Sequence, residues 1–213
     1  MTPSPPRRIG RHHQPNAVKL VSATLASLVF IAACSTASDD IDGVFVDVAE
    51  IATFGTIAEL VEASSVVMEG EVVSVVRGRV SVVPELEDFA GTQMLDVTIV
   101  SIDQLAGEPA DRITIEWMGW EIGDDGSPGP QFLVEGMPPP KVGDKAIWFF
   151  RSRPNPPAGS AATHSIASLD GRLDIAADGT VTTQIVGENR LATRLSGTRV
   201  DDIKAAVKDT LRP

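Results

Sequence analysis

Apolar residues recur at every second position in several stretches of this chain, and this period of two limits the fold more than any other feature. Between Val66 and Val76 the even positions are mostly apolar or small, so we expect a strand whose even face points inward. Residues 113–117 repeat the pattern, with Ile, Ile and Trp on one face. Residues 146–150 are apolar at every position and predict a buried strand. The pattern favours a mainly β domain.

The longest predicted strand runs from about Thr92 to Leu105. Its apolar residues occupy odd positions up to Ile99 and even positions from Val100 onward. Such a change of face indicates a β-bulge, which bends a strand and increases its twist. Because the strands of a small barrel must bend to close it, we expect these strands to form a small barrel.

Helix signals flank the strands on both sides. Thr56, with Glu59 three residues later, forms a capping-box pattern and predicts a short helix that ends near Ser64. Thr198 is the expected N-cap of a C-terminal helix. We expect the apolar face of that helix to pack over the barrel. This face consists of Val200, Ile203, Val207 and Leu211.

A hairpin and two loop regions complete the predicted domain. The hairpin joins residues 172–175 to residues 180–184 through an Ala-Ala-Asp-Gly turn. Residues 166–169 are expected to begin this part of the sheet. Proline and glycine concentrate in residues 123–130 and 154–159, which predicts two exposed loops.

Several of these stretches together resemble a known fold. They are Val67-Met68-Glu69-Gly70-Glu71-Val72, the strand from Asp96 that ends at Ala106-Gly107, residues 113–117, and Val142 to Phe150. Over roughly residues 56–185 the arrangement resembles the OB-fold of netrin-type and metalloproteinase-inhibitor-like domains. The resemblance implies a mainly β fold in residues 51–213, namely a small OB-like five-stranded barrel with a short N-terminal helix and a C-terminal helix.

One departure from that family bears on function. Its metalloproteinase inhibitors use a free amino-terminal cysteine, fixed beside the first strand by a disulfide, to chelate the zinc of the enzyme. Here Cys34 is the only cysteine and lies far ahead of the first predicted strand, so it has no disulfide partner within the chain. The resemblance therefore implies a fold, and inhibition by that route is not expected.

The first 33 residues show the order of charge and hydropathy of an export signal. Basic residues, with no acidic one among them, precede an uncharged run over residues 20–33. As a helix, that run would cover about 21 Å at roughly 1.5 Å per residue, against a hydrocarbon core of about 30 Å. We therefore expect the h-region of a signal peptide and not a stable transmembrane helix.

Small residues and a cysteine end this run. Ile31, Ala32, Ala33 and Cys34 match a lipobox, and the segment resembles bacterial lipoprotein signal peptides. In that family the cysteine sulfur receives a diacylglycerol and a peptidase cuts just before the cysteine. The resemblance implies a signal peptide over residues 1–33, acyl chains such as palmitate on Cys34, and anchoring at the extracytoplasmic face of the cell membrane. An ordinary secretory signal or an uncleaved anchor is the alternative interpretation.

Charge and composition limit the partners of the mature chain. Residues 34–50 are small and acidic, which suits a tether between the lipid and the folded domain. The chain has a formal net charge of -11, and loss of the basic export segment makes it more negative, so we expect no nucleic-acid partner. A lone cysteine and, after the export segment, a lone histidine favour neither a metal site nor a cofactor.

Candidate ligand-binding residues gather where the strand at 113–117 runs into a loop rich in proline and glycine. Trp120 follows the last alternating residue of that strand, so its ring is expected either exposed at a barrel mouth or as a lid over the barrel. Glu121 and the adjacent acids Asp124 and Asp125 follow it. Aromatic rings in such places stack on sugars or anchor protein partners, so a protein or a saccharide is the expected ligand.

The titratable residues do not predict catalysis, although two alternatives stay open. A hydrolase would have to use His164 or carboxylates such as Asp124-Asp125, Asp201-Asp202 or the acids of residues 85–88. A purely structural envelope lipoprotein would need no ligand surface. The prediction is a lipid-anchored extracytoplasmic binding module that is not an enzyme.

Overall fold

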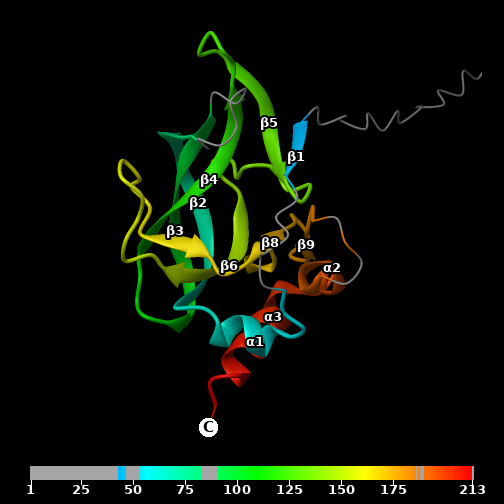
Figure 1. Cartoon of the computed structure of the whole chain (residues 1–213). Helices are drawn as coiled ribbons and strands as arrows, with labels where there is room; N and C mark the ends of the chain where they lie inside the picture. The colour runs from blue at the N-terminus through cyan, green and yellow to red at the C-terminus, as the bar shows by residue number, and fades with distance from the viewer. Residues whose placement is uncertain (1–42, 47–52, 83–90, 186, 188–189, 213) are drawn as a thin grey trace, which may run out of the picture. The chain divides into compact units, whose positions relative to one another are not determined.

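The computed structural model describes residues 43–46, 53–82, 91–185, 187 and 190–212 (Figure 1). Its contacts divide the chain into a unit Met1–Asp39 and a unit Asp40–Pro213, and all described residues belong to the second. Strands dominate this unit, which confirms the mainly β fold class. Its elements are β1 (Gly43–Val46), α1 (Ile57–Glu62), β2 (Val66–Ser81), β3 (Thr92–Gly107), β4 (Arg112–Ile122), β5 (Pro128–Val134), β6 (Lys145–Ser152), β7 (His164–Ile166), the 3₁₀ turn η1 (Leu169–Gly171), β8 (Arg172–Ile175), β9 (Val181–Thr182), α2 (Leu191–Leu195) and α3 (Val200–Asp209).

Five of these strands close into a barrel. β2, β3 and β4 form an antiparallel meander, and β6 pairs with the other edge of β2. β7 completes the ring because it pairs antiparallel with β6 and parallel with β4, where Ile115 lies opposite His164. The resulting order, β4-β3-β2-β6-β7 and back to β4, confirms the small OB-like barrel.

The sheet is closed only at one end. β6 pairs with β2 from Val66 to Glu71, whereas β2 continues to Ser81 alongside β3. β5 and then β1 extend the sheet beyond β4, and β1 runs parallel to β5 (Figure 1). We call the part of the sheet that β6 does not cover the open half of the sheet. It comprises residues 73–81 of β2 and the stretches of β3, β4 and β5 that pair in turn beside them. We call its inner face the mouth of the barrel.

The core of the barrel centres on β6. Every side chain from Ala146 to Phe150 is fully buried, which confirms the strand that was expected to be buried. The rings of Trp148 and Phe150 stack with their centroids 5.8 Å apart. Ile113, Ile115 and Trp117 of β4 are also buried, as their alternation predicts. Each such large apolar side chain contributes roughly 1.5–3 kcal/mol on burial.

Helices α1 and α3 lie together at the closed end of the barrel (Figure 1). α1 begins after Thr56, whose side-chain oxygen accepts a hydrogen bond from the Glu59 amide at 3.2 Å, so the predicted cap is confirmed. α3 packs against α1 and β3. Its Lys204 ammonium pairs with Glu69 of β2 and, at 3.2 Å, with Asp103 of β3. These ion pairs therefore tie α3 to the barrel strands β2 and β3.

Two predicted faces are wrong, because bulges change the register of β2 and β3. Val73 has no partner between the pairs Val72–Ile99 and Ser74–Thr98, so the even face of β2 points outward after this point. Val76, expected inside, is 53% exposed. On β3 the register shifts at Ile102 and near its end, not at the step after Ile99, and Ile102 is 50% exposed.

The C-terminal helix begins one residue later than predicted. Thr198 is held by backbone hydrogen bonds, since its carbonyl accepts from Val181 at 2.8 Å and its amide donates to Leu195 at 3.0 Å. The N-cap of α3 is instead Arg199, with no side-chain capping bond. Three residues of the expected apolar face are buried, but Leu211 lies beyond the helix and is 54% exposed.

Several short elements differ from the prediction. The strand expected over 166–169 is β7, which ends at Ile166, and a 3₁₀ turn follows. β5 begins inside the predicted loop 123–130, because prolines are tolerated where a strand starts at a sheet edge. α2 was not predicted. Residues 43–46 of the expected tether pair with β5 as β1, whereas the rest of residues 34–50 lies outside the described residues.

Candidate functional site

The mouth of the barrel carries a groove that we call the Trp120 groove. It has a volume of about 480 Å³ and lies between the open half of the sheet and the segment after β5. Trp120 is half-buried in its wall, and the guanidinium of Arg77 lies 5.1 Å from the ring centroid. The groove is lined by Val75, Val76, Arg77, Leu95, Trp120, Gln131, Pro139, Pro140, Lys141 and Val142.

A bulge at Gly119 turns Trp120 into this groove. Strict alternation after Trp117 would place residue 119 inside and Trp120 outside. The register with β3 shifts here, so Trp120 lies opposite Gln93 and on the same face as Leu95. A Cβ on Gly119 would meet the Gln93 carbonyl oxygen at 2.6 Å, so only glycine fits. The Trp-Met-Gly-Trp sequence was the available signal for this bulge.

The other predicted ligand residues lie outside the groove. Glu121 sits on β4 opposite Thr92 and is half-buried. Asp124 and Asp125 are exposed in the turn between β4 and β5. The Ser127 amide donates to Asp125 Oδ1 at 2.9 Å, and hydrogen bonds from Ser127 lower the pKa of this carboxyl. The structure thus brings only Trp120 of the four to the groove.

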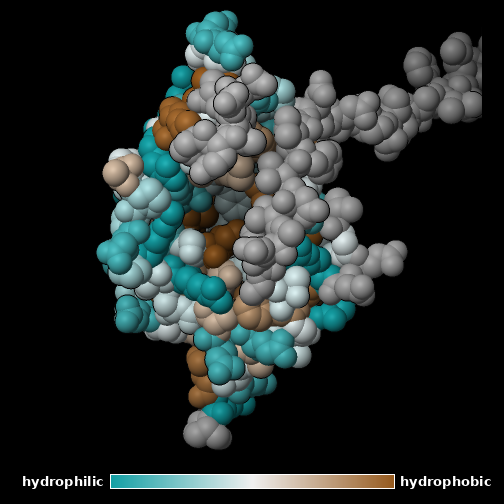
Figure 2. Space-filling model, in the orientation of Figure 1, coloured by the Kyte–Doolittle hydropathy of each residue, from teal (hydrophilic) through white to brown (hydrophobic). Residues whose placement is uncertain are grey.

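Apolar side chains are accessible at the surface of the molecule. Figure 2 shows brown side chains in a hollow near the centre of the face in view, with teal residues on its left. Val76 and Val142, which line the Trp120 groove, are 53% and 64% exposed. The groove's charged residues are Arg77 and Lys141, and no acid lines it within the described part of the chain.

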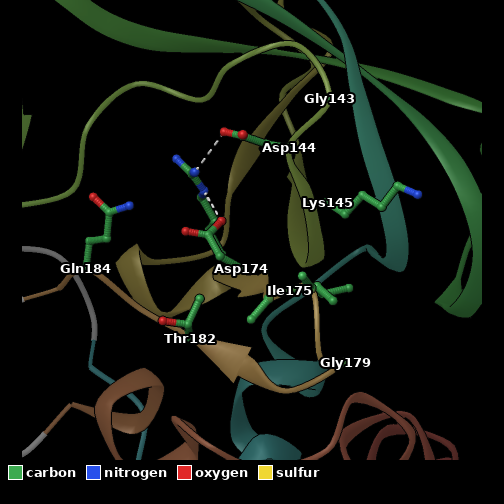
Figure 3. Close-up of a pocket in the computed structure, with 11 residues that line it drawn as sticks. Gly143, Asp144, Lys145, Asp174, Ile175, Gly179, Thr182 and Gln184 are labelled. Atoms are coloured by element: carbon green, nitrogen blue, oxygen red, sulfur yellow. Dashed lines mark hydrogen bonds and ion pairs between the residues drawn. The ribbon is translucent and has the colours of Figure 1, made fainter. Parts of the chain in front are cut away.

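A second and larger groove, the Arg172 groove, has a volume of about 620 Å³ (Figure 3). It lies where the start of β6 meets the hairpin β8–β9. Sequence reasoning treated these residues only as turn and hairpin positions and missed the groove. Its lining consists of Gly143, Asp144, Lys145, Arg172, Asp174, Ile175, Ala176, Ala177, Gly179, Thr182 and Gln184.

Arg172 forms the floor of this groove and is only 3% exposed. Its guanidinium donates to Asp174 Oδ1 at 2.6 Å, to the Pro138 carbonyl at 3.0 Å and to Asp144 Oδ2 at 3.3 Å. The same group lies 5.6 Å from the ring centroids of both Trp117 and Trp148. Burial raises the pKa of the Asp174 carboxyl, although the charge of Arg172 opposes the shift.

No family model matches this chain, and no curated protein or solved structure matches it. The residues that carry the predicted export signal, including Ile31, Ala32, Ala33 and Cys34, lie outside the described residues. None of the helices in the described part is long and apolar enough to cross a membrane.

Two carboxylates face each other on the outer side of β3 and β4. Asp96 lies opposite Glu116 in the strand register, and the Glu116 side chain is only 3% exposed. Arg79 binds both Glu116 oxygens, at 2.8 and 3.1 Å, and Arg153 binds one at 3.3 Å. Asp96 Oδ1 is buried without a hydrogen-bond partner among the described residues. This pair was not predicted from the sequence, because its two members are far apart in the chain and only the register between β3 and β4 brings them together.

The two environments move the pKa values in opposite directions. Burial raises the pKa of Asp96, and the neighbouring Glu116 charge adds to the rise, against the Ala161 amide and Arg79. Burial alone would also raise the pKa of Glu116, but hydrogen bonds and charge attraction from Arg79, with help from Ser160 and Arg153, lower it on balance. The arginines and the β6–β7 loop therefore hold one carboxylate ionised beside a carboxyl that resists ionisation.

Opposite pH dependences of stability follow from this pair. Glu116 stabilises the fold above its unfolded pKa, and this contribution is lost as the pH falls through its lowered folded pKa. Asp96 contributes stability below its unfolded pKa and loses it as the pH rises through its raised folded pKa. Asp96→Asn is therefore expected to raise the free energy of unfolding at neutral pH, with a smaller effect below pH 3.8.

Urea unfolding at a series of pH values checks this expectation. The matched control is Asp111→Asn, which changes an exposed aspartate and is expected to leave stability nearly unchanged at every pH. An Asp96→Asn protein that is less stable than the wild type at neutral pH would show that the Asp96 carboxylate is favourable in the fold.

The described residues of the hydrolase alternative lie on separate elements, and the acids of residues 85–88 lie outside the described residues. His164 on β7 is half-buried, and its ring stands edge-on to that of Phe150 with the two ring centroids 6.2 Å apart. Its Nδ1 lies 3.0 Å from the Thr163 hydroxyl oxygen. Burial lowers the pKa of this imidazole, against the charge of Glu108. Asp201 and Asp202 are exposed in the first turn of α3. No group of three or more His, Cys, Asp or Glu that could hold a metal ion occurs among the described residues.

Proposed function

We propose that this protein is a lipid-anchored extracytoplasmic binding module without catalytic activity, and that its Trp120 groove takes an extended peptide segment of a partner protein. The observation that carries the ligand proposal is the lining of the groove. It combines an indole ring and the exposed Val142 with two cations and no acid within the described residues, in a chain of formal net charge -11. The complementary segment is apolar and carries at least one carboxylate.

Arg77 is the group expected to bind that carboxylate. Its guanidinium lies over the face of Trp120, which holds the charge at a defined place in the groove. A guanidinium can donate two parallel hydrogen bonds to a carboxylate. The negative charges elsewhere on the protein oppose an acidic ligand only weakly, because physiological salt screens exposed charges beyond about 8 Å.

The apolar part of the ligand is expected to contact Trp120, Val75 and Val142. An extended peptide presents alternate side chains on one face, so apolar residues can enter the groove while polar neighbours stay in water. Buried aromatic residues at the centre of an interface often supply most of the binding energy. Trp120 is placed for that role because it is half-buried and lines the groove.

The anchoring part of the proposal rests on the sequence alone. Ile31-Ala32-Ala33-Cys34 follows a basic segment and an uncharged run, as in lipoprotein signal peptides. We also propose that the OB-like barrel is related to netrin-type domains. Compared with a hydrolase, a binding module has more support, since the Glu116 carboxylate is held by two arginines and Asp124 and Asp125 are exposed in a turn.

Fluorescence anisotropy with labelled octapeptides tests the ligand class. One peptide set alternates Val or Phe with Glu, and a matched set carries Lys in place of each Glu. The purified full-length protein is expected to bind the acidic set more tightly than the basic set. Trp120→Ala and Arg77→Ala are each expected to weaken binding of the acidic set about tenfold or more, as for a central interface residue.

Ile102→Ala serves as the matched control, because Ile102 is an exposed apolar residue outside the groove. This variant is expected to bind the peptides as the wild type does. Equal binding of the two peptide sets, or binding that survives both groove variants, would remove the support for this ligand.

A further inference from the structure

We infer that the Arg172 groove is a second, independent binding site, and that its ligand is a neutral saccharide. The Arg172 groove and the Trp120 groove share no lining residue. The volume of the Arg172 groove, about 620 Å³, lies within the range usual for small-molecule sites, roughly 300–1,000 Å³.

The charges of the lining cancel. Asp144 and Asp174 carry two negative charges, and Lys145 and Arg172 carry two positive ones. An anionic ligand would meet two carboxylates, and a cationic ligand would meet a guanidinium and an ammonium. A polar ligand without net charge avoids both repulsions and can still hydrogen-bond to the groups of the lining that have bonding capacity left.

The floor of the groove is fixed in place before any ligand arrives. Arg172 uses all three of its guanidinium nitrogens within the protein, and the rings of Trp117 and Trp148 lie against it. Asp144 is held as well, since its Oδ2 accepts from the Lys141 amide at 2.7 Å. A ligand therefore orders few side chains on this floor, which lowers the entropy lost on binding.

Other polar groups in the groove have bonding capacity left. Asp174 binds Arg172 through Oδ1, and its Oδ2 makes no hydrogen bond within the described residues. The Thr182 hydroxyl and the Gln184 amide likewise make none there, and both residues are exposed. Figure 3 shows these side chains around one side of the groove, whereas Lys145 extends away from them and pairs with Glu71 at 3.5 Å.

These groups match the chemistry of a sugar. A carboxylate oxygen accepts from a sugar hydroxyl, an amide donates to one and accepts from another, and a threonine hydroxyl does either. Ile175, Ala176 and Ala177 add an apolar wall, which suits the C–H face of a pyranose ring. A ring with equatorial hydroxyls presents aliphatic C–H faces and a rim of hydroxyls, so one face can lie on the apolar wall while the rim meets the polar groups.

Isothermal titration calorimetry with three neutral trisaccharides tests the inference, using cellotriose, maltotriose and triacetylchitotriose. At least one is expected to bind the full-length protein with a dissociation constant of about 1 mM or below. Charged analogues, namely trigalacturonate and chitosan trimer, are expected to bind more weakly. Gln184→Ala and Thr182→Ala are each expected to raise the dissociation constant of the neutral ligand about fivefold to tenfold, as for the loss of one hydrogen bond.

Gln131→Ala is the matched control, because it removes an amide from the Trp120 groove and not from the Arg172 groove. Saccharide binding is expected to be unchanged in this variant and in Trp120→Ala. A dissociation constant above about 1 mM for every neutral trisaccharide, or binding that Gln184→Ala and Thr182→Ala leave unchanged, overturns the inference. Because peptide binding uses other residues, either site can fail while the other stands.

Discussion

Cells that produce Cys34→Ala are expected to lose metabolically labelled palmitate from this protein entirely. The thiol of Cys34 is the only cysteine sulfur in the chain, so no other thioether to a diacylglycerol can form. Each buried methylene contributes roughly 0.8 kcal/mol to membrane binding, and a single acyl chain holds a protein only marginally. Without acyl chains the protein is expected either to leave the membrane fraction or to persist as an uncleaved precursor.

Gel mobility, membrane fractionation and the palmitate label distinguish these outcomes. Ser38→Ala is a matched control, since it changes a small residue of the same segment and leaves the cysteine in place. It is expected to keep both label and membrane association. A Cys34→Ala protein that still carries palmitate would mean that lipid is attached elsewhere and that the proposed anchor is wrong.

Replacing Arg172 by alanine is expected to lower the free energy of unfolding by about 3–5 kcal/mol, the usual loss when one partner of a buried ion pair is removed. Arg172 is only 3% exposed, and its guanidinium donates hydrogen bonds to three acceptors. Its loss leaves the Asp174 carboxylate and the Pro138 carbonyl without their donor. Urea unfolding followed by tryptophan fluorescence measures the change.

Two further variants separate charge from packing. Arg151→Ala removes an exposed arginine whose Nε donates to the Ala63 carbonyl at 2.9 Å, and it is expected to cost about 1 kcal/mol or less. The double variant Arg172→Met with Asp174→Leu removes both charges and keeps apolar volume, so it is expected to recover much of the lost stability. A single Arg172→Ala variant no less stable than Arg151→Ala would contradict the role given to the buried guanidinium.

Much of the fold could be predicted from local patterns. Alternation identified β2, β3 and β4, unbroken hydropathy identified β6, and the capping box located α1. These signals are local because a strand or helix shows its buried face within a few residues. The turn signal located the hairpin of β8 and β9, and the strand expected over 166–169 is the shorter β7. The five-residue helix α2 carries too few residues for such a pattern and was not predicted.

The candidate site was predicted less well than the fold. Trp120 was expected either exposed at a barrel mouth or as a lid over the barrel, and which way its ring points depended on the bulge at Gly119. Asp124 and Asp125 were predicted as ligand-binding residues together with Trp120, but they lie in an exposed turn outside the groove. The Arg172 groove and the Asp96–Glu116 pair each join residues from different strands, and no short-range pattern connects such residues.

The sequence by itself determined that this chain forms strands with one apolar face, where the most buried strand lies, and that Thr56 caps the helix α1. It also carries the predicted lipid anchor at Cys34, whose chemistry needs only neighbours in the chain. Only the tertiary structure decided which side chains meet. Closing the barrel through β7 and shifting the register at Val73, Ile102 and Gly119 set the partners of each residue. A shift of one residue moves every later side chain to the other face, and that step depends on contacts between distant strands.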